Sequence, residues 1–273
     1  MVMLAGNLAF SPEFEKAKAD LQSVREKYAV MVEEYTHLTG VVAKNLETDY
    51  MLKIGKKEYD LFSCQVEILR LKREISLFQA ARNRGETITV EEVKKIIEKE
   101  FAEYQDQLKK QNAKLEFAKV YFGAKPLSPE ENKKLKKLYH DMVRKLHPDL
   151  NCDLPAEAAV LWEQLQTAYQ MNDWQELYLL SEMVEELLDG KKDFVGSINS
   201  LVKLQEELAK IIKKSSELSE QIKKTKERVP FVYEKLLSDP AAVRAKRQEL
   251  DAQIKLCRER MQELQELRHN LGA

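Results

Sequence analysis

An unbroken heptad pattern near the N-terminus constrains the fold of this chain more than any other feature of its sequence. Ser11-Pro12-Glu13 reads as a helix N-cap followed by proline at the first helical position. After it, apolar side chains recur at alternating spacings of three and four residues: Phe14, Ala17, Leu21, Val24, Tyr28, Met31, Tyr35, Leu38 and Val42. Such a stripe is the seam of a coiled coil, so the sequence predicts a long helix that packs along its length against another helix.

Several later segments carry helical stripes as well. Residues 50–82 carry two apolar stripes, which predicts a neighbour on each of two faces. Thr89-Val90-Glu91-Glu92 reads as a capping box that opens a third helix. Asp239-Pro240 caps the last one. The stripes are Leu61, Cys64, Ile68, Leu71, Ile75 and Phe78, with Tyr59, Phe62, Val66 and Leu69 beside them; Val93, Ile97, Phe101, Tyr104, Leu108, Leu115, Ala118 and Phe122; Leu201, Leu204, Leu208, Ile211, Leu218 and Ile222; and Val243, Leu250, Ile254, Cys257, Met261 and Leu264.

The simplest architecture pairs the helices before residue 122 with those after residue 196 as antiparallel neighbours. We therefore predict an all-α fold in which long coiled-coil helices form an elongated arm, with residues 1–112 as its N-terminal region and 190–273 as its C-terminal region. Spacing alone leaves open whether the arm closes within one chain or between two chains of a homodimer. Core packing explains every stripe without a ligand and is favoured over the alternative of a cofactor-lined bundle, so no cofactor is predicted.

The overall composition limits the classes of function. The 45 basic and 46 acidic side chains nearly cancel, which gives no support to general nucleic-acid binding. The cysteines Cys64, Cys152 and Cys257 are odd in number and far apart, as expected for reduced thiols. No apolar run approaches the roughly 18 residues of a membrane-spanning helix, and the start, MVMLAGNLAF, lacks the basic leader of a signal peptide. We expect a soluble, cytoplasmic protein with neither a nucleic acid nor a membrane as partner.

The segment 113–189 departs from these stripes and is predicted to be an inserted helical hairpin. Ser128-Pro129-Glu130-Glu131 reads as a capping box that opens a basic helix. Pro148 stops this helix and pushes His147 out of helical geometry, so His147-Pro148-Asp149 begins a loop, and a new helix starts near Pro155. The residues predicted to form the core between the two helices are Tyr139, Met142, Trp162, Leu165, Ala168 and Tyr169.

Together, these residues resemble the J-domain co-chaperones, a family with two antiparallel helices joined by a loop that bears the tripeptide His-Pro-Asp. The tripeptide here is His147-Pro148-Asp149, with Tyr139 eight residues before it, where the family has its helix-two tyrosine. Upstream, VYFGAKPLSPEE looks like the family's entry into helix two. Downstream, the family's core positions on its third helix are matched by Trp162, Leu165, Ala168 and Tyr169. The resemblance covers about 75 residues, little more than a quarter of the chain.

The resemblance implies a function. J domains dock on a DnaK-type ATPase chaperone and stimulate its ATP hydrolysis through the His-Pro-Asp loop and the positive face of helix two, and they do no chemistry themselves. By this resemblance, the chain is expected to be a co-chaperone and not an enzyme, and its coiled-coil arm is expected to bind an unknown client. The residues assigned to docking are His147, Pro148, Asp149, Lys134, Lys136, Lys137, Arg144 and Lys145.

Two departures from the family pattern favour another class of function. His140 and Asp141 occupy positions that are usually basic in the family, so the positive patch is interrupted. No Lys or Arg lies between Asp153 and Asp189, a stretch that is rich in acidic side chains. Such a neighbour would weaken attraction to an acidic ATPase surface, or it would serve another partner. The alternative is a structural coiled-coil scaffold or adaptor with a J-like fold that does not stimulate an ATPase.

The sequence gives little support to a metal site, a cysteine nucleophile or a nucleic-acid-binding surface in this region. A metal site built from His140, His147, Asp149 and Cys152 lacks the short, repeated ligand spacings of structural zinc sites. Cys152 as a nucleophile lacks an orienting partner and an oxyanion element. The lysine pairs at 133–134 and 136–137 have acids interleaved nearby and no aromatic stacking platform, so a solvated surface or a protein partner is preferred to nucleic acid. Neither catalytic residues nor a metal are predicted.

Overall fold

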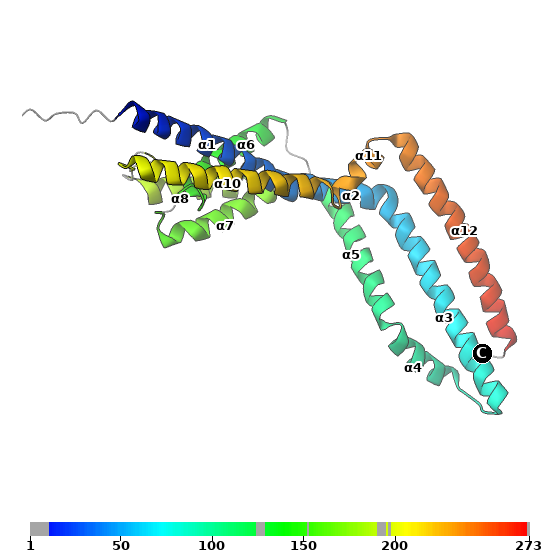
Figure 1. Cartoon of the computed structure of the whole chain (residues 1–273). Helices are drawn as coiled ribbons and strands as arrows, with labels where there is room; N and C mark the ends of the chain where they lie inside the picture. The colour runs from blue at the N-terminus through cyan, green and yellow to red at the C-terminus, as the bar shows by residue number, and fades with distance from the viewer. Residues whose placement is uncertain (1–10, 124–128, 152, 190–194, 196–197, 272–273) are drawn as a thin grey trace, which may run out of the picture. The chain divides into compact units, whose positions relative to one another are not determined.

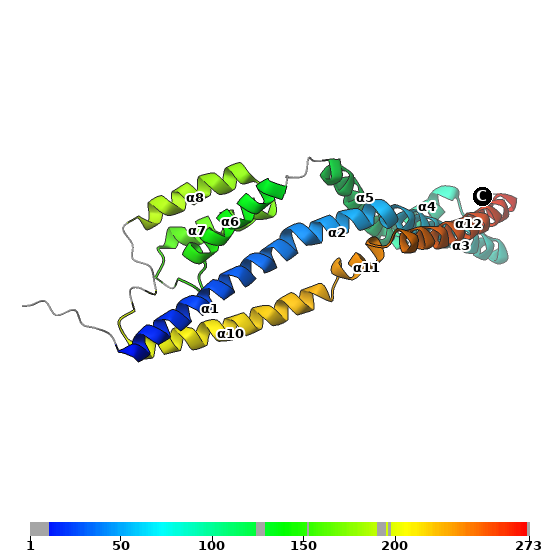
Figure 2. The same ribbon diagram turned by 90° about the horizontal axis from the view of Figure 1, so that it is seen from above.

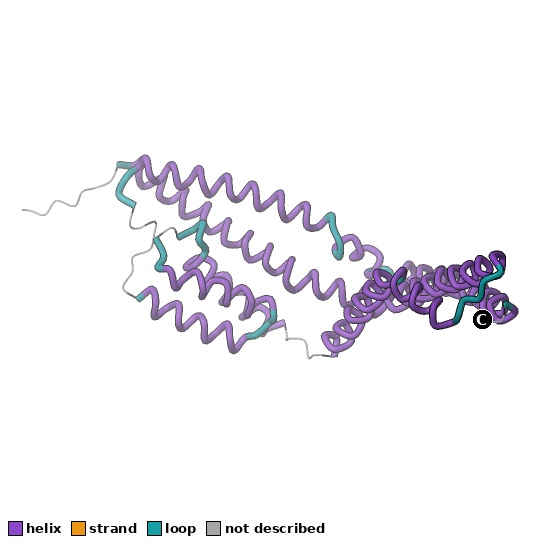
Figure 3. Tube along the Cα trace, turned by 90° about the horizontal axis from the view of Figure 1, so that it is seen from below, coloured by secondary structure: helices purple, strands orange, loops and turns teal. Residues whose placement is uncertain are grey.

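The computed structural model describes residues 11–123, 129–151, 153–189, 195 and 198–271, and all regular secondary structure in these ranges is helical (Figure 3). The predicted all-α class is therefore confirmed. Within the same ranges, no helix is both long enough and apolar enough to cross a membrane.

The chain divides into two compact units, each built from segments that are far apart in the sequence. The first unit comprises Met1–Lys44 and Pro126–Phe231, and the second comprises Asn45–Lys125 and Val232–Ala273. The sequence analysis had instead assigned the consecutive segments 1–112, 113–189 and 190–273. The structure places the helix that follows Ser11 and the one that follows Ser200 in the same unit as the predicted hairpin.

The first unit is organised around α1 (Pro12–His37), which begins where Ser11 Oγ accepts a hydrogen bond from the Phe14 amide at 3.2 Å. The chain continues through a π-helical turn, η1 (Leu38–Val42), into α2 (Ala43–Tyr50). Most of α2, from Asn45 on, belongs to the second unit, and the other helices of the first unit are α6 (Pro129–Leu146), α7 (Ala156–Gln170), α8 (Trp174–Leu188) and α10 (Leu201–Lys226). Contacts link α1 to α10 and also to α6, and link α8 to both α6 and α7.

Helices α1 and α10 lie side by side and run in the same direction (Figure 2). Residues further along α1 contact residues further along α10: Tyr28 lies near Glu217, and Glu34 pairs with Lys226 at 3.2 Å. The expected antiparallel arrangement is therefore wrong for this pair. A heptad stripe has the same spacing whichever way its partner runs, so the sequence pattern carried no information on direction.

Two buried faces on α1 explain how it holds both neighbours. The predicted stripe supplies Phe14, Ala17, Leu21 and Tyr28, all buried. A second set, offset from it around the helix, is buried too and includes polar residues: Arg25, Ala29, Val32 and Thr36. The second face was not predicted, because arginine and threonine interrupt its apolar pattern.

In the second unit, α3 (Lys56–Arg84) is packed on two sides, as its two stripes predicted (Figure 1). On one side Leu71 and Ile75 form a cluster with Leu264 of α12 (Pro240–Asn270). On the other side, Val66 packs with residues of α4 (Val90–Glu100) and of α5 (Ala102–Gly123), among them Val93, Ile97 and Leu108. The prediction of two neighbours is confirmed, although Leu69 of the second stripe is exposed.

Helices α3 and α12 are also parallel. Lys57 pairs with Asp251, and further along both helices Glu74 pairs with Arg268 at 2.7 Å. The short elements η2 (Met51–Gly55) and α11 (Glu234–Leu237) precede these two helices, and their apolar side chains Ile54 and Leu237 share a core cluster with Leu250. The 3-10 turn η3 (Phe231–Tyr233) spans the boundary of the two units.

The predicted third helix is two helices in the structure. Its start is as expected, because Thr89 and Glu92 form the capping box: the Glu92 amide donates to Thr89 Oγ1 at 3.2 Å, and the Thr89 amide donates to Glu92 Oε2 at 2.9 Å. The backbone leaves helical geometry at Phe101, with φ −101° and ψ 9°, and so separates α4 from α5. The apolar spacing continues across this break, which is why the pattern alone did not reveal it.

Candidate functional site

The candidate site is the HPD loop (residues 147–151), which follows α6. Helix α6 ends at Leu146, two residues before Pro148, because proline cannot continue the helix. The amides of Leu150 and Asn151 both donate to the His147 carbonyl, at 2.9 and 3.0 Å, and close a tight turn. Leu150 is buried, whereas Pro148 is exposed.

His147 is held between two aromatic rings. The Tyr28 ring of α1 meets it edge-on at a centroid distance of 5.4 Å, and the Trp162 ring of α7 at 5.1 Å. Burial among these rings lowers the pKa of His147 to about 4, because a charged imidazolium loses its hydration there. The Asp149 amide donates to His147 Nδ1 at 3.1 Å, a contact that requires Nδ1 to carry no proton. The imidazole is therefore neutral at pH 7.

Asp149 contacts α1, which precedes the loop in the sequence, and α10, which follows it. Tyr28 Oη donates to Asp149 Oδ2 at 2.7 Å, and Lys214 Nζ of α10 lies 3.6 Å from Asp149 Oδ1. Burial and the adjacent carboxylate both raise the pKa of Tyr28, so its hydroxyl stays protonated and remains a donor. The carboxylate therefore accepts a hydrogen bond from α1 and pairs with a lysine of α10.

Arg25 of α1 fixes the end of the loop. Its guanidinium donates to the Leu150 carbonyl and, at 3.2 Å, to Asn151 Oδ1. Asn151 in turn donates from Nδ2 to the Arg144 carbonyl at 2.8 Å, which satisfies a carbonyl in the last turn of α6. Both ends of the loop are thus tied to neighbouring helices.

The predicted docking residues differ in their surroundings. Arg144 pairs with Glu26 of α1 at 3.0 Å, and Lys145 pairs with Glu185 of α8. Lys134 and Lys137 are exposed on α6, while Lys136 is partly buried. The structure therefore brings His147 and Asp149 together with α1 and α10, and it leaves Pro148 and two lysines open to solvent.

The six residues assigned to the hairpin core lie on α6 and α7 and are all buried: Tyr139, Met142, Trp162, Leu165, Ala168 and Tyr169. The Tyr139 and Tyr169 rings stack with centroids 4.0 Å apart. Their hydroxyls reach α1, where Tyr169 Oη donates to Glu33 Oε1 at 2.7 Å and Tyr139 Oη donates to Thr36 Oγ1 at 3.3 Å. Burial raises the pKa of Tyr139 to about 12, so it stays neutral. This core holds α6 and α7 on α1 and so positions the loop.

Sequence reasoning missed Tyr28, Arg25 and Lys214 as contacts of the loop. Tyr28 had been assigned only to the heptad stripe, and Arg25 lies beside that stripe. One feature of the sequence indicated a polar partner for Tyr28 and Arg25. A tyrosine and an arginine three residues apart are unusual on a buried helix face. Nothing local to Lys214 distinguished it from the other lysines of its helix.

A metal centre has no support in the described ranges, which contain no group of three or more His, Cys, Asp or Glu side chains placed to hold an ion. His140 instead lies 3.0 Å from Glu26. Cys152, which the sequence analysis had weighed as a ligand and as a nucleophile, lies outside the described residues.

Comparison with known proteins finds no match for this chain among protein-family models, curated proteins or solved structures.

Proposed function

We propose that the chain is a structural scaffold or adaptor in which a J-like hairpin, α6 and α7, is held on a coiled-coil arm through its HPD loop, and that in this form it does not stimulate a DnaK-type ATPase. The observation that carries this proposal is the pair of contacts from Tyr28, which donates a hydrogen bond to Asp149 and packs its ring against His147. A DnaK-type partner would need both side chains.

The proposal also gives a packing reason for the order His-Pro-Asp. His147 fills the space between Tyr28 and Trp162, Pro148 ends α6, and Asp149 receives Tyr28 and Lys214. A hairpin with a purely structural role therefore has a use for each of the three residues. The basic helix fits the same role, because Arg144 and Lys145 pair with acidic side chains of the chain itself.

A second candidate function is a co-chaperone whose docking site opens when α1 and α10 move away from the loop. It is supported by the exposure of Pro148, Lys134 and Lys137, which lie on the elements that the resemblance assigns to docking. In this case the contacts of Tyr28 and Lys214 would hold the site closed, and a client bound to the arm would release it.

Single-turnover ATP hydrolysis by the host's DnaK-type chaperone tests both functions. The scaffold proposal predicts that the wild-type chain does not stimulate ATP hydrolysis. It predicts the same for the doubly substituted Tyr28→Phe, Lys214→Ala variant, which lacks two contacts that hold Asp149. A J-domain protein of the same host serves as the positive control. Stimulation by wild type that disappears in His147→Gln would refute the scaffold proposal. Stimulation by the double variant alone would establish the closed co-chaperone.

A further inference from the structure

Helix α8 presents an unusual concentration of large apolar side chains to solvent. Trp174, Tyr178, Leu179 and Met183 are exposed to 37, 51, 56 and 46%. The opposite face of the same helix is buried against α6 and α7 through Leu177, Leu180 and Val184. Exposed apolar side chains that gather on one element, and above all aromatic ones, mark interaction sites more often than scattered ones do. The outward face is therefore a candidate surface and does not belong to the core of its own unit.

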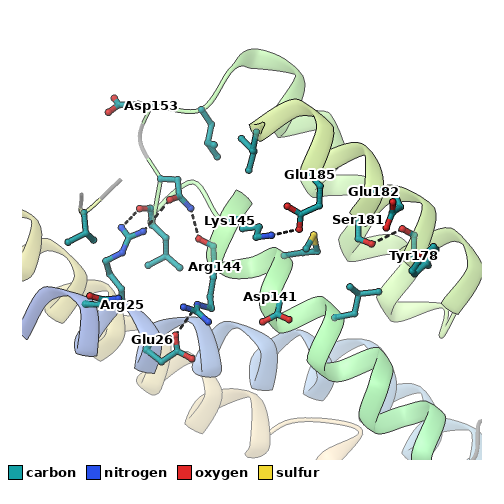
Figure 4. Close-up of a pocket in the computed structure, with 18 residues that line it drawn as sticks. Arg25, Glu26, Asp141, Arg144, Lys145, Asp153, Tyr178, Ser181, Glu182 and Glu185 are labelled. Atoms are coloured by element: carbon teal, nitrogen blue, oxygen red, sulfur yellow. Dashed lines mark hydrogen bonds and ion pairs between the residues drawn. The ribbon is translucent and has the colours of Figure 1, made fainter. Parts of the chain in front are cut away.

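Beside this face lies a pocket of about 850 Å³ between α1, α6 and α8 (Figure 4). Tyr178 lines it from α8, and Leu138 and Met142 line it from α6. A bulky side chain from a partner that lies along α8 can enter this space. We use the name α8 surface for six exposed residues of α8 together with one pocket residue of α6: Trp174, Tyr178, Leu179, Glu182, Met183 and Glu186, with Asp141.

The charges around the α8 surface define which partner fits it. Three basic side chains line the pocket, and each has a partner: Arg25 donates to the Leu150 carbonyl and to Asn151, Arg144 pairs with Glu26, and Lys145 pairs with Glu185. Asp141 and Glu182 also line the pocket, and neither forms an ion pair with a described residue. No Lys or Arg occurs from Leu154 to Leu188, so nothing on α7 or α8 balances these carboxylates. The exposed apolar side chains of α8 therefore lie among acidic side chains of the same helix, with no basic side chain on α8 itself.

We propose that the α8 surface docks a basic amphipathic helix of a partner protein. The apolar side chains of that helix pack on Trp174, Tyr178 and Met183, and its flanking lysine or arginine side chains pair with Asp141 and Glu182. A helix suits this site because α8 offers ridges and grooves along an open helical face. An acidic membrane surface or a nucleic acid is repelled by the same carboxylates. The inference rests on the proposed function, since it names the partner class that the scaffold would hold.

Binding of a defined peptide to the full-length chain tests the inference. The probe is a fluorescent peptide of about 18 residues, five helical turns, with leucines on one face and lysines on the other, measured by anisotropy. We expect the Trp174→Ala, Tyr178→Ala variant to bind at least about tenfold more weakly, as for interface aromatics. Asp141→Asn with Glu182→Gln should weaken binding about threefold to tenfold and reduce its dependence on salt.

Two controls make the result specific. Leu256→Ala removes an apolar side chain of α12, in the other unit, that is 66% exposed and so more exposed than Trp174 or Tyr178, and it should leave the affinity within about twofold. A peptide with glutamates in place of the lysines should not bind. Equal binding of all variants, or equal binding of the glutamate peptide, would overturn the inference. A dimer of the chain that dissociates on Trp174→Ala, Tyr178→Ala would also overturn it, because a second copy would then occupy the surface.

The outcomes for the two proposals remain separable. ATPase stimulation by the wild-type chain would refute the scaffold proposal but would not change the interpretation of peptide binding to the α8 surface. If the peptide does not bind and the ATPase is not stimulated, the proposal for the α8 surface is wrong and the scaffold proposal is retained. The substitutions on α8 lie on exposed side chains, so loss of binding without loss of helical circular dichroism reports on the surface itself.

Discussion

The pH dependence of stability gives a direct test of the buried state of His147. Burial lowers the pKa of His147 from its usual value of 6.5 to about 4. Between these two values the unfolded chain binds a proton that the folded chain does not, so falling pH favours unfolding. Above pH 6.5 both states are neutral at this residue, and below pH 4 both are charged. The stabilising contribution of His147 is thus present at pH 7 and lost progressively from about pH 6.5 to pH 4.

The magnitude follows from the difference between the two pKa values. Each pKa unit corresponds to about 1.4 kcal/mol, so the free energy of unfolding should fall by about 3 kcal/mol over this range because of His147. Other groups titrate there too, including His37, whose pKa is lowered by burial. The difference between wild type and His147→Gln isolates the one residue, because the other groups contribute equally to both.

Urea unfolding followed by tryptophan fluorescence measures this difference. Both tryptophans, Trp162 and Trp174, lie in the first unit, so the signal reports on the unit that contains the loop. The stability of the wild type relative to His147→Gln should decrease by about 3 kcal/mol between pH 7 and pH 4. A constant difference across this range, or a His147 resonance that titrates in NMR at pH 6.5 or above, would show that His147 is not buried as a neutral imidazole.

Three further predictions follow from named contacts. Tyr28→Phe removes the hydroxyl that donates to Asp149 and should cost about 1–2 kcal/mol in the free energy of urea unfolding at pH 7; an unchanged midpoint would mean that α1 does not hold the loop. Leu165→Ala empties a fully buried position and should cost about 2–5 kcal/mol by the same assay; a cost below about 1 kcal/mol would contradict its place in the core. Burial raises the pKa of Cys64 to about 12 beside the Cys257 thiol, and diamide should join the two thiols slowly, at a rate that rises with pH. Peptide mass spectrometry should detect that pair in the monomer, with Cys257→Ser as control, and its absence would contradict the parallel register of α3 and α12.

The local features of the fold could be predicted from the sequence alone. Ser11, Thr89 and Asp239 fixed helix starts, since a side-chain oxygen that caps backbone amides acts within three residues. Pro148 fixed the end of α6 for an equally local reason. The two apolar faces of α3 followed from spacing along a single helix. Each of these depends on residues within a few turns of one another, and there the pattern is sufficient.

Which helices surround the HPD loop, and in which direction they run, depends on how the helices pack across the whole unit. A heptad stripe has the same spacing for parallel and antiparallel partners, so the sequence could not orient α10 on α1. The contact between Tyr28 and Asp149 joins residues 121 positions apart, and the one between Arg25 and Asn151 joins residues 126 apart. Such contacts arise from helix packing over the whole unit. The sequence therefore identified the His-Pro-Asp loop as the candidate site, and the packing of α1 and α10 determined that its histidine and aspartate are held within the chain.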